Sequence, residues 1–221
     1  MVLEEWLAER QAIAGLLAGL YRGDLANGIT GLRTLLPFWQ GSPCESAGWY
    51  PALAELAEDL DFGQTEERLA EISDDYRRLF GGPGQLLAPP WESVYRTKEK
   101  LLFGEPEAAV RRFYRSFGMA VTVDTEAADH VAMEFAFLGR LSALAMDAPE
   151  RLFDILTAQR DFLSEHLLQW LPAWSADVSR HAKCVVWRCL AVLTVGWLEN
   201  DLAETERARC HLSKGLDTNM A

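Results

Sequence analysis

Apolar residues recur at three- and four-residue steps through most of the chain, the spacing that gathers them on one face of an α-helix. In the first eighty residues this spacing predicts three helices, marked by Ile13, Leu16, Leu17 and Leu20, by Leu53, Leu56, Ala57 and Leu60, and by Leu69, Ile72, Tyr76, Leu79 and Phe80. Gly81 and Gly82 are expected to end the third, since glycine commonly terminates helices.

The second half of the chain continues the helical pattern. Glu105 and Pro106 begin a helix, because proline suits the first helical turn, and Gly118 ends it. Three more helices are expected at about 128–146, 147–168 and 177–202, with Pro172 as punctuation between the last two and a polar tail that frays from residue 204. Period-two alternation is weak, and VTVD at 121–124 is the one short candidate for a strand.

These elements predict an all-α fold, a helical bundle of about eight to ten helices with a long hinge loop. We expect one domain covering residues 1–221. Within it an N-terminal helical part, 1–80, and a C-terminal helical part, 105–203, are joined by a hinge loop, 81–104, and followed by a polar tail, 204–221.

The charge of the chain narrows the choice of partners. It has 21 basic against 33 acidic side chains, a formal net charge of -12. Phosphate binding needs a basic surface, so nucleic acid and an anionic membrane surface are both disfavoured. An acidic surface either keeps the protein in solution or attracts a basic peptide.

Cysteines and termini bear on the compartment. None of Cys44, Cys184, Cys189 and Cys210 forms a C-x-x-C pair, and isolated thiols fit a reducing cytosol. The acidic N-terminus lacks the basic region of a secretory signal, and the longest apolar run, 189–198, is too short to span a membrane. We therefore expect a cytoplasmic protein without stable membrane insertion.

The Gly- and Pro-rich segment 79–106 is long for a connection between helices, and long structured loops are often functional. Pro89 and Pro90 favour an extended backbone that stiffens the approach to Trp91. Trp91 and Tyr95, four residues apart, either line a groove for a peptide or fill the core where the loop crosses the bundle.

A second polar group follows at Asp129, His130 and Glu134. His130 and Glu134 are four residues apart and would share one face of a helix. Three interpretations are open: a half-buried polar spot in a binding groove, half of a metal site without its other ligands, or a core histidine held by Glu134. Asp129 can also simply stabilise a helix N-terminus. Phosphate-loop and hydrolase motifs are absent, and we expect neither an enzyme nor a cofactor.

Four segments in this order carry a resemblance: YRRLFGGPG, PPWESVY, KLLFGEP and ADHVAMEFAFL, with HLLQWLPAW after them. Over residues 76–175 they resemble the TorD/DmsD family of redox-enzyme maturation chaperones. The resemblance implies two helical parts about a hinge and a cytoplasmic protein that binds the twin-arginine signal peptide of a molybdenum-cofactor enzyme. It also implies that the protein holds the apo form of that molybdoenzyme subunit until cofactor insertion, as a monomer or a domain-swapped homodimer.

The resemblance carries over to single residues. Trp91, Ser93 and Tyr95 match the loop motif, and Asp129, His130 and Glu134 match the helix motif, whose Asp-His pair the family associates with signal-peptide binding. Two alternatives stay open: a NarJ-type assembly factor that binds the mature part of a reductase subunit, and a metal-dependent enzyme at His130 and Glu134. Aromatic walls beside carboxylates suit a peptide with two arginines and an apolar stretch.

Overall fold

The computed structural model describes residues 3–40, 48–61, 65–98, 102–120 and 127–219, almost all of them helical. The α-helices are α1 (Leu3–Arg22), α2 (Leu25–Gln40), α3 (Tyr50–Asp61), α4 (Glu66–Tyr76), α5 (Glu92–Arg96), α6 (Glu105–Ser116), α7 (Val131–Asp147), α8 (Leu152–Phe162), α9 (Leu168–His181) and α10 (Val185–Asn219). Two π-helical turns, η1 (Arg77–Gly81) and η3 (Leu163–Leu167), and a 3-10 turn, η2 (Pro149–Arg151), continue or connect them. The predicted all-α fold is confirmed, and among the described residues β pairing is limited to one isolated bridge.

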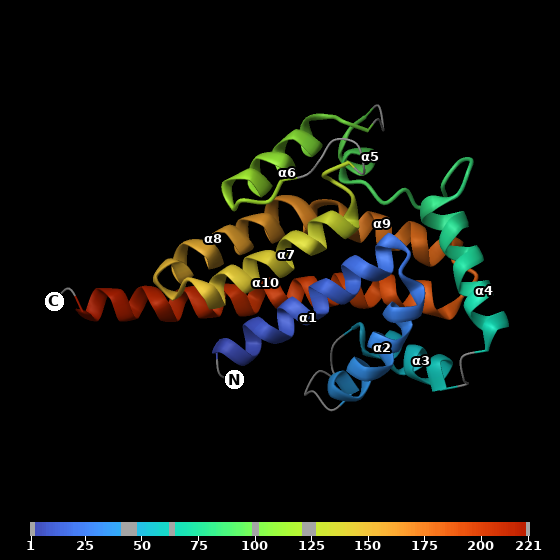
Figure 1. The fold of residues 1–221 in the computed structure, drawn as a ribbon, viewed down its shortest axis with the longest axis horizontal. Helices are drawn as coiled ribbons and strands as arrows, with labels where there is room; N and C mark the ends of the chain where they lie inside the picture. The colour runs from blue at the N-terminus through green and yellow to red at the C-terminus, as the bar shows by residue number, and fades with distance from the viewer. Residues whose placement is uncertain (1–2, 41–47, 62–64, 99–101, 121–126, 220–221) are drawn as a thin grey trace.

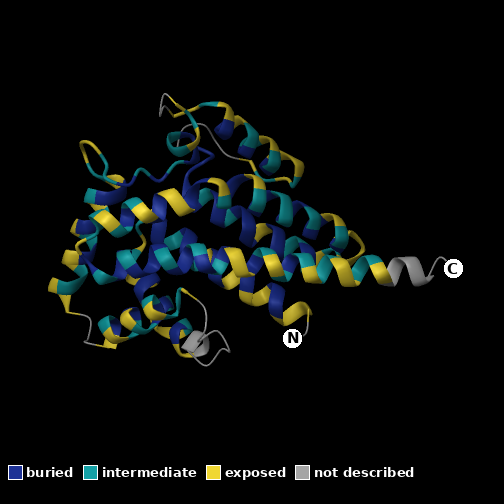
Figure 2. Ribbon diagram, turned by 180° about the vertical axis from the view of Figure 1, so that it is seen from behind, coloured by how far each residue is buried: buried dark blue, intermediate teal, exposed yellow. Residues whose placement is uncertain are grey.

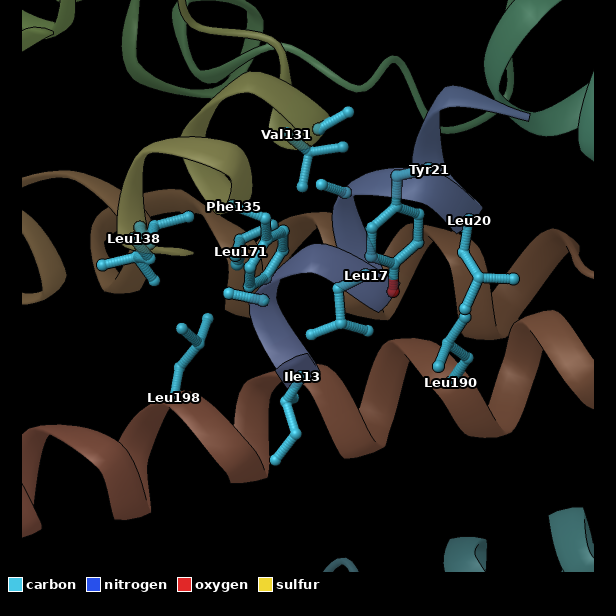
Figure 3. Packing of buried hydrophobic residues seen from close by; sticks show 14 of the residues in the cluster. Ile13, Leu17, Leu20, Tyr21, Val131, Phe135, Leu138, Leu171, Leu190 and Leu198 are labelled. Carbon is cyan, nitrogen blue, oxygen red and sulfur yellow. The ribbon is translucent and has the colours of Figure 1, made fainter. Parts of the chain in front are cut away.

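The helices pack around a core shared by all parts of the chain. In Figure 1, α8 and α9 follow each other along α10, with α7 beside α8 and α1 packed on α7. The helices α5 and α6 lie on one side of this group and α2 and α3 on the other. Figure 3 shows Ile13 and Leu17 of α1 in one cluster with Phe135 of α7 and with Leu190 and Leu198 of α10. Figure 2 shows buried positions concentrated where the helices cross and exposed ones along the end of α10 near the C-terminus.

Two helix boundaries near the middle of the chain differ from the sequence expectations. α7 begins at Val131 rather than near residue 128, because His130 is its N-cap. Pro172 lies inside α9 and does not end a helix there; the chain passes from α8 through the π-helical turn η3 into α9.

The last helices also differ from the expectation of one helix over 177–202. The chain breaks after His181, and α10 begins at Val185. Asp75 of α4 stabilises this break, since its Oδ2 accepts hydrogen bonds from the backbone N–H groups of Lys183 and Cys184, both at 2.8 Å.

The tail expected to fray from residue 204 is helical instead, since α10 runs on to Asn219, with ion pairs such as Arg209 with Glu206 along it. The strand candidate at 121–124 and Cys44 lie outside the described residues. The division into two parts about a hinge stays a prediction.

A buried ion pair ties three helices together. Arg10 of α1 contacts both carboxylate oxygens of Asp201 of α10, at 2.5 and 2.6 Å, and donates to Gln159 of α8 at 2.6 Å. The side chains of Arg10 and Asp201 are only 4% and 2% exposed. A buried charge without its partner is costly, so each helix restrains the other two.

We expect Arg10→Met to lower the free energy of unfolding by about 3–5 kcal/mol, because Asp201 then stays buried without its partner. Urea unfolding at neutral pH measures the change. Arg207→Met, at an exposed arginine paired with Glu204, serves as the control and should cost under about 1 kcal/mol. Equal losses in the two variants would contradict the role given to Arg10.

Candidate functional site

The loop after α4 is held to the helices along its length. The chain leaves η1 at Gly82, where an added Cβ would lie 2.5 Å from the carbonyl oxygen of Arg77, so glycine alone fits. Ala88 then donates its N–H to the Leu79 carbonyl at 3.0 Å, and the indole of Trp174 donates to the Ala88 carbonyl at 3.2 Å. These contacts fix the approach to Trp91.

At Trp91 the loop pairs with the residues that precede α7. Val131 donates its N–H to the Pro90 carbonyl at 2.9 Å, and Glu92 donates to the Asp129 carbonyl at 3.0 Å, forming an antiparallel bridge between Trp91 and His130. We call this contact the loop–helix clamp. It brings together the two segments that the sequence analysis had selected separately.

The side chains of the clamp reinforce the backbone pairing. Asp129 accepts a hydrogen bond from the Ser93 N–H at 2.8 Å, through Oδ2. Both residues are fully buried. Burial raises the pKa of the Asp129 carboxyl group, against the opposing effect of hydrogen bonding from Ser93. The carboxylate therefore anchors the start of α5 from inside the protein.

His130 caps α7 with its ring. Its Nδ1 accepts the N–H of Ala132 at 3.1 Å, so the proton of the neutral imidazole sits on Nε2. The ring lies edge-on to Trp91, with centroids 5.6 Å apart. Burial, with a smaller contribution from the charge of Arg22, lowers the pKa of His130 from 6.5 to about 4. The imidazole is neutral at pH 7.

Glu134, in the first turn of α7, is fully buried and accepts a hydrogen bond from the indole of Trp170 at 3.1 Å. Burial and the nearby carboxylates of Glu92 and Asp129 raise its pKa well above 4.5. In its protonated form the carboxyl group gains an O–H donor, and burial beside two other carboxylates favours that form. The interpretation in which Glu134 holds the His130 ring is wrong, because each side chain bonds to a different group.

Glu92 was missed by sequence reasoning, although it lies within the PPWESVY segment. It is fully buried, pairs with Arg96, and its two carboxylate oxygens lie 3.0 and 3.1 Å from Nδ1 of His166. His166 is 74 positions further along the chain. Glutamate and histidine in two aromatic-rich segments were the available signal, but periodicity does not pair them.

Tyr95 lies on the outer side of α5. Its ring packs on Trp170, with centroids 5.6 Å apart, and its hydroxyl group contacts Oδ2 of Asp177 at 3.3 Å. Burial, and then the charge of Asp177, raises the pKa of Tyr95. Tyr95 and Trp91 are partly exposed, whereas Ser93, Asp129, His130 and Glu134 are buried.

The structure thus places the six predicted site residues at one junction of α5, α7 and α9, with two of them open to solvent. The metal-site interpretation gains no ligands: within the described ranges no group of three or more His, Cys, Asp and Glu side chains is arranged to hold an ion. The described helices also include none that is long and apolar enough to cross a membrane.

The fold is an all-helical bundle in which a proline-rich loop pairs with the start of α7 beside a buried polar junction. The chain belongs to the nitrate reductase delta subunit family, whose model matches residues 42–176. Its relatives are TorD and DmsD chaperones, which confirms the resemblance seen in the sequence.

Three relatives illustrate the similarity. The "Chaperone protein TorD" of Vibrio cholerae is 32% identical over 134 residues, which cover 59% of this chain and 60% of that protein. The TorD protein of Shewanella sp. strain ANA-3 is 30% identical over 71% of this chain and 74% of its own length. The "Probable Tat proofreading chaperone DmsD" of Haemophilus influenzae is 33% identical over 58% of this chain and 59% of its own.

The first of these matches therefore spans about three fifths of its relative's length. A solved structure from Archaeoglobus fulgidus, a candidate redox enzyme maturation protein, aligns over 90% of this chain and 94% of its own with 20% identity and a TM-score of 0.48.

We expect His130→Asn to remove part of the acid sensitivity of the fold. The pKa of His130 is lowered in the folded state, from 6.5 to about 4. The free energy of unfolding therefore decreases as the pH falls through this window, by roughly 3 kcal/mol in total. Asparagine keeps a capping oxygen but does not titrate. Chemical unfolding between pH 7 and 4 measures the difference; the exposed His211→Asn should keep the wild-type slope.

We expect the opposite pH dependence from Glu134. Because the pKa of Glu134 is raised in the folded state, its contribution to the free energy of unfolding is fully present below pH 4.5. That contribution is lost as the pH rises towards the folded-state pKa, by at most about 1.4 kcal/mol per pH unit. Glu134→Gln keeps an acceptor for Trp170 and should abolish this loss. The difference in unfolding free energy, wild type minus variant, should decrease as the pH is raised from about 5 to about 8. A constant difference would contradict the buried protonated carboxyl group, and the exposed Glu199→Gln is the control.

Proposed function

We propose that this protein is a maturation chaperone that binds the twin-arginine signal peptide of a molybdenum-cofactor enzyme before cofactor insertion and export. The observation that carries the proposal is the loop–helix clamp, which presents the partly exposed Trp91 and Tyr95 beside a buried polar junction. The relatives named TorD and DmsD chaperones support the same function.

The exposed part of the junction has the chemistry that such a peptide needs. A guanidinium group stacks on an aromatic ring, and Trp91 and Tyr95 offer partly exposed rings. Asp177, whose side chain is 34% exposed, adds a carboxylate beside the Tyr95 hydroxyl group. A net charge of -12 favours the approach of a basic peptide.

In this proposal the buried residues of the junction position the exposed ones and do not bind the peptide themselves. Ser93, Asp129 and Glu134 have no exposed surface, so they hold Trp91 and α5 in place and do not touch the peptide in this conformation. His130, 6% exposed, supports the edge of the Trp91 ring. The six residues are proposed as one signal-peptide site in this sense.

The remaining parts of the proposal follow the family. The protein would act in the cytoplasm, without enzymatic activity, on the apo form of a molybdoenzyme subunit. It would be a monomer or a homodimer that exchanges helical parts about the hinge loop at 81–104.

A second candidate is an assembly factor that binds the mature part of a reductase subunit. The description of the matching family, a nitrate reductase delta subunit, favours it. A pulldown with client lacking its leader separates the two candidates: retained binding supports the assembly factor, and lost binding supports leader recognition.

We expect the protein to bind a synthetic leader peptide with two adjacent arginines followed by an apolar stretch, and to bind its Lys-Lys variant more weakly. Trp91→Ala should weaken binding about 10-fold or more, the effect of losing a ring that a cation and an apolar chain both contact. Isothermal titration calorimetry measures both effects.

Trp49→Ala, at another partly exposed tryptophan at the start of α3, is the matched control and should leave affinity unchanged. Circular dichroism checks that both variants keep their helices. Failure to bind every leader from the same genome would refute leader recognition.

A further inference from the structure

A recess of about 390 Å³ opens at the end of α5, between the first turn of α6 and the π-helical turn η3. Its walls include Arg96, Glu105, Glu165 and His166. The recess is on α5 with Trp91 and Tyr95, but it contains none of the six residues of the proposed site. π-helical turns are rare and occur often at functional sites, which makes η3 a place to look for binding.

His166 gives the recess an unused acceptor. The residue is 4% exposed, and its ring packs against Phe113 and Phe162 at centroid distances of 5.4 and 5.2 Å. Its Nδ1 lies 3.0 Å from the carboxylate of Glu92, which can only accept, so the tautomer that pairs with Glu92 carries its proton on Nδ1. Nε2 then has a lone pair, and no described residue donates a hydrogen bond to it.

The charges around the recess leave one carboxylate uncompensated. Arg96 pairs with Glu92 and donates to the Glu165 carbonyl at 2.8 Å, and Arg112 pairs with Glu105 at 3.2 Å. The Glu165 side chain is exposed and makes no hydrogen bond or ion pair within the described part of the chain. The recess is therefore lined by this carboxylate and by the imidazole of the next residue, a combination that favours a cation able to donate at two points.

Two exposed apolar residues come shortly before Glu105, which lines the recess. Leu102 and Phe103, 39% and 66% exposed, come just before Glu105, and with Leu3 they are the large hydrophobic residues left open on the described surface. Phe103 has a φ of 63°, a left-handed conformation that is strained for a bulky residue. Such strain is concentrated at functional positions. An arginine in the recess could be followed by apolar residues on this edge.

We propose that this recess is the subsite for an arginine guanidinium group of the client leader, accepted by the Glu165 carboxylate and Nε2 of His166. The planar, forked guanidinium group can donate to both acceptors at once, whereas an ammonium group acts as a single point of charge. The proposal deepens the proposed function and rests on it for the identity of the peptide.

The first experiment tests the recess without a leader. Long-range ¹H–¹⁵N spectra of protein with ¹⁵N-labelled histidine rings are recorded during titration with Nα-acetyl-arginine amide, with the citrulline and lysine analogues as controls. The Nε2 resonance of His166, identified by its absence from His166→Asn, should shift with the arginine compound and much less with citrulline. The absence of that shift at tens of millimolar would overturn the proposal.

The second experiment uses the Arg-Arg leader peptide. Glu165→Gln and His166→Asn should each weaken its binding about 5- to 10-fold, the effect of losing one exposed charge-assisted contact. Asparagine keeps a donor near the position of Nδ1 for Glu92 but has no group at Nε2. Glu58→Gln, at an exposed acid on α3 on the far side of the molecule from α6, changes the net charge equally and should bind as wild type does.

The outcomes separate the two proposals. If wild type binds the leader and both variants bind it equally well, the recess is not the arginine subsite, and the proposed function stands. If arginine amide shifts His166 but no leader binds, the recess binds guanidinium, and leader recognition fails. Thermal unfolding of each variant confirms that a loss of binding does not reflect a loss of fold.

Discussion

The geometry of the junction depends on two backbone hydrogen bonds, Val131 to Pro90 and Glu92 to Asp129. They join a proline-stiffened loop to the start of α7, over a separation of about forty residues, without forming a sheet. Because proline offers a carbonyl but no N–H, Pro90 can take part in this pairing only as an acceptor. The side chains of α5 and of the α7 N-terminus take their positions from this contact.

The clamp brings polar groups into an apolar centre, where each must find a partner. Asp129 accepts a hydrogen bond from the Ser93 N–H, and Glu134 accepts one from the Trp170 indole. Glu92 pairs with Arg96 and His166. These partners belong to α5, η3 and α9, so the contacts of the three carboxyl groups also specify how these elements meet. The mainly apolar core fixes the bundle, and this small polar set fixes the direction of α5.

The local sequence pattern predicts the helices but not the contacts between them. The periodicity around Ile13 and Leu17, the glycines after Phe80 and the proline at the start of α6 suffice to predict elements, because their causes lie within a few residues. The break before α10 depends on Asp75, more than a hundred residues away, and is not visible in that pattern.

The candidate site divides in the same way. Trp91 and His130 could be selected from the sequence because family motifs mark both, and the structure places them in contact. The pairing of Glu92 with His166 depends on tertiary folding, and the role of His130 as an N-cap depends on where the loop turns. Reading residues 130 and 134 as one helical face failed because the first of them precedes the helix.

The π-helical turn η3 has a consequence for how the chain tolerates changes in length. A π-helical turn holds one more residue than the α-helical turn that it replaces. In a regular α-helix each residue turns the chain by about 100°, so an added residue rotates everything after it. The wide π-helical turn absorbs its extra residue within one turn, so α8 and α9 keep nearly the phase of one continuous helix. Deleting one residue at η3 would therefore remove mainly the local bulge around Glu165 and His166, whereas the same deletion inside α8 or α9 would rotate one helix face away from its partners.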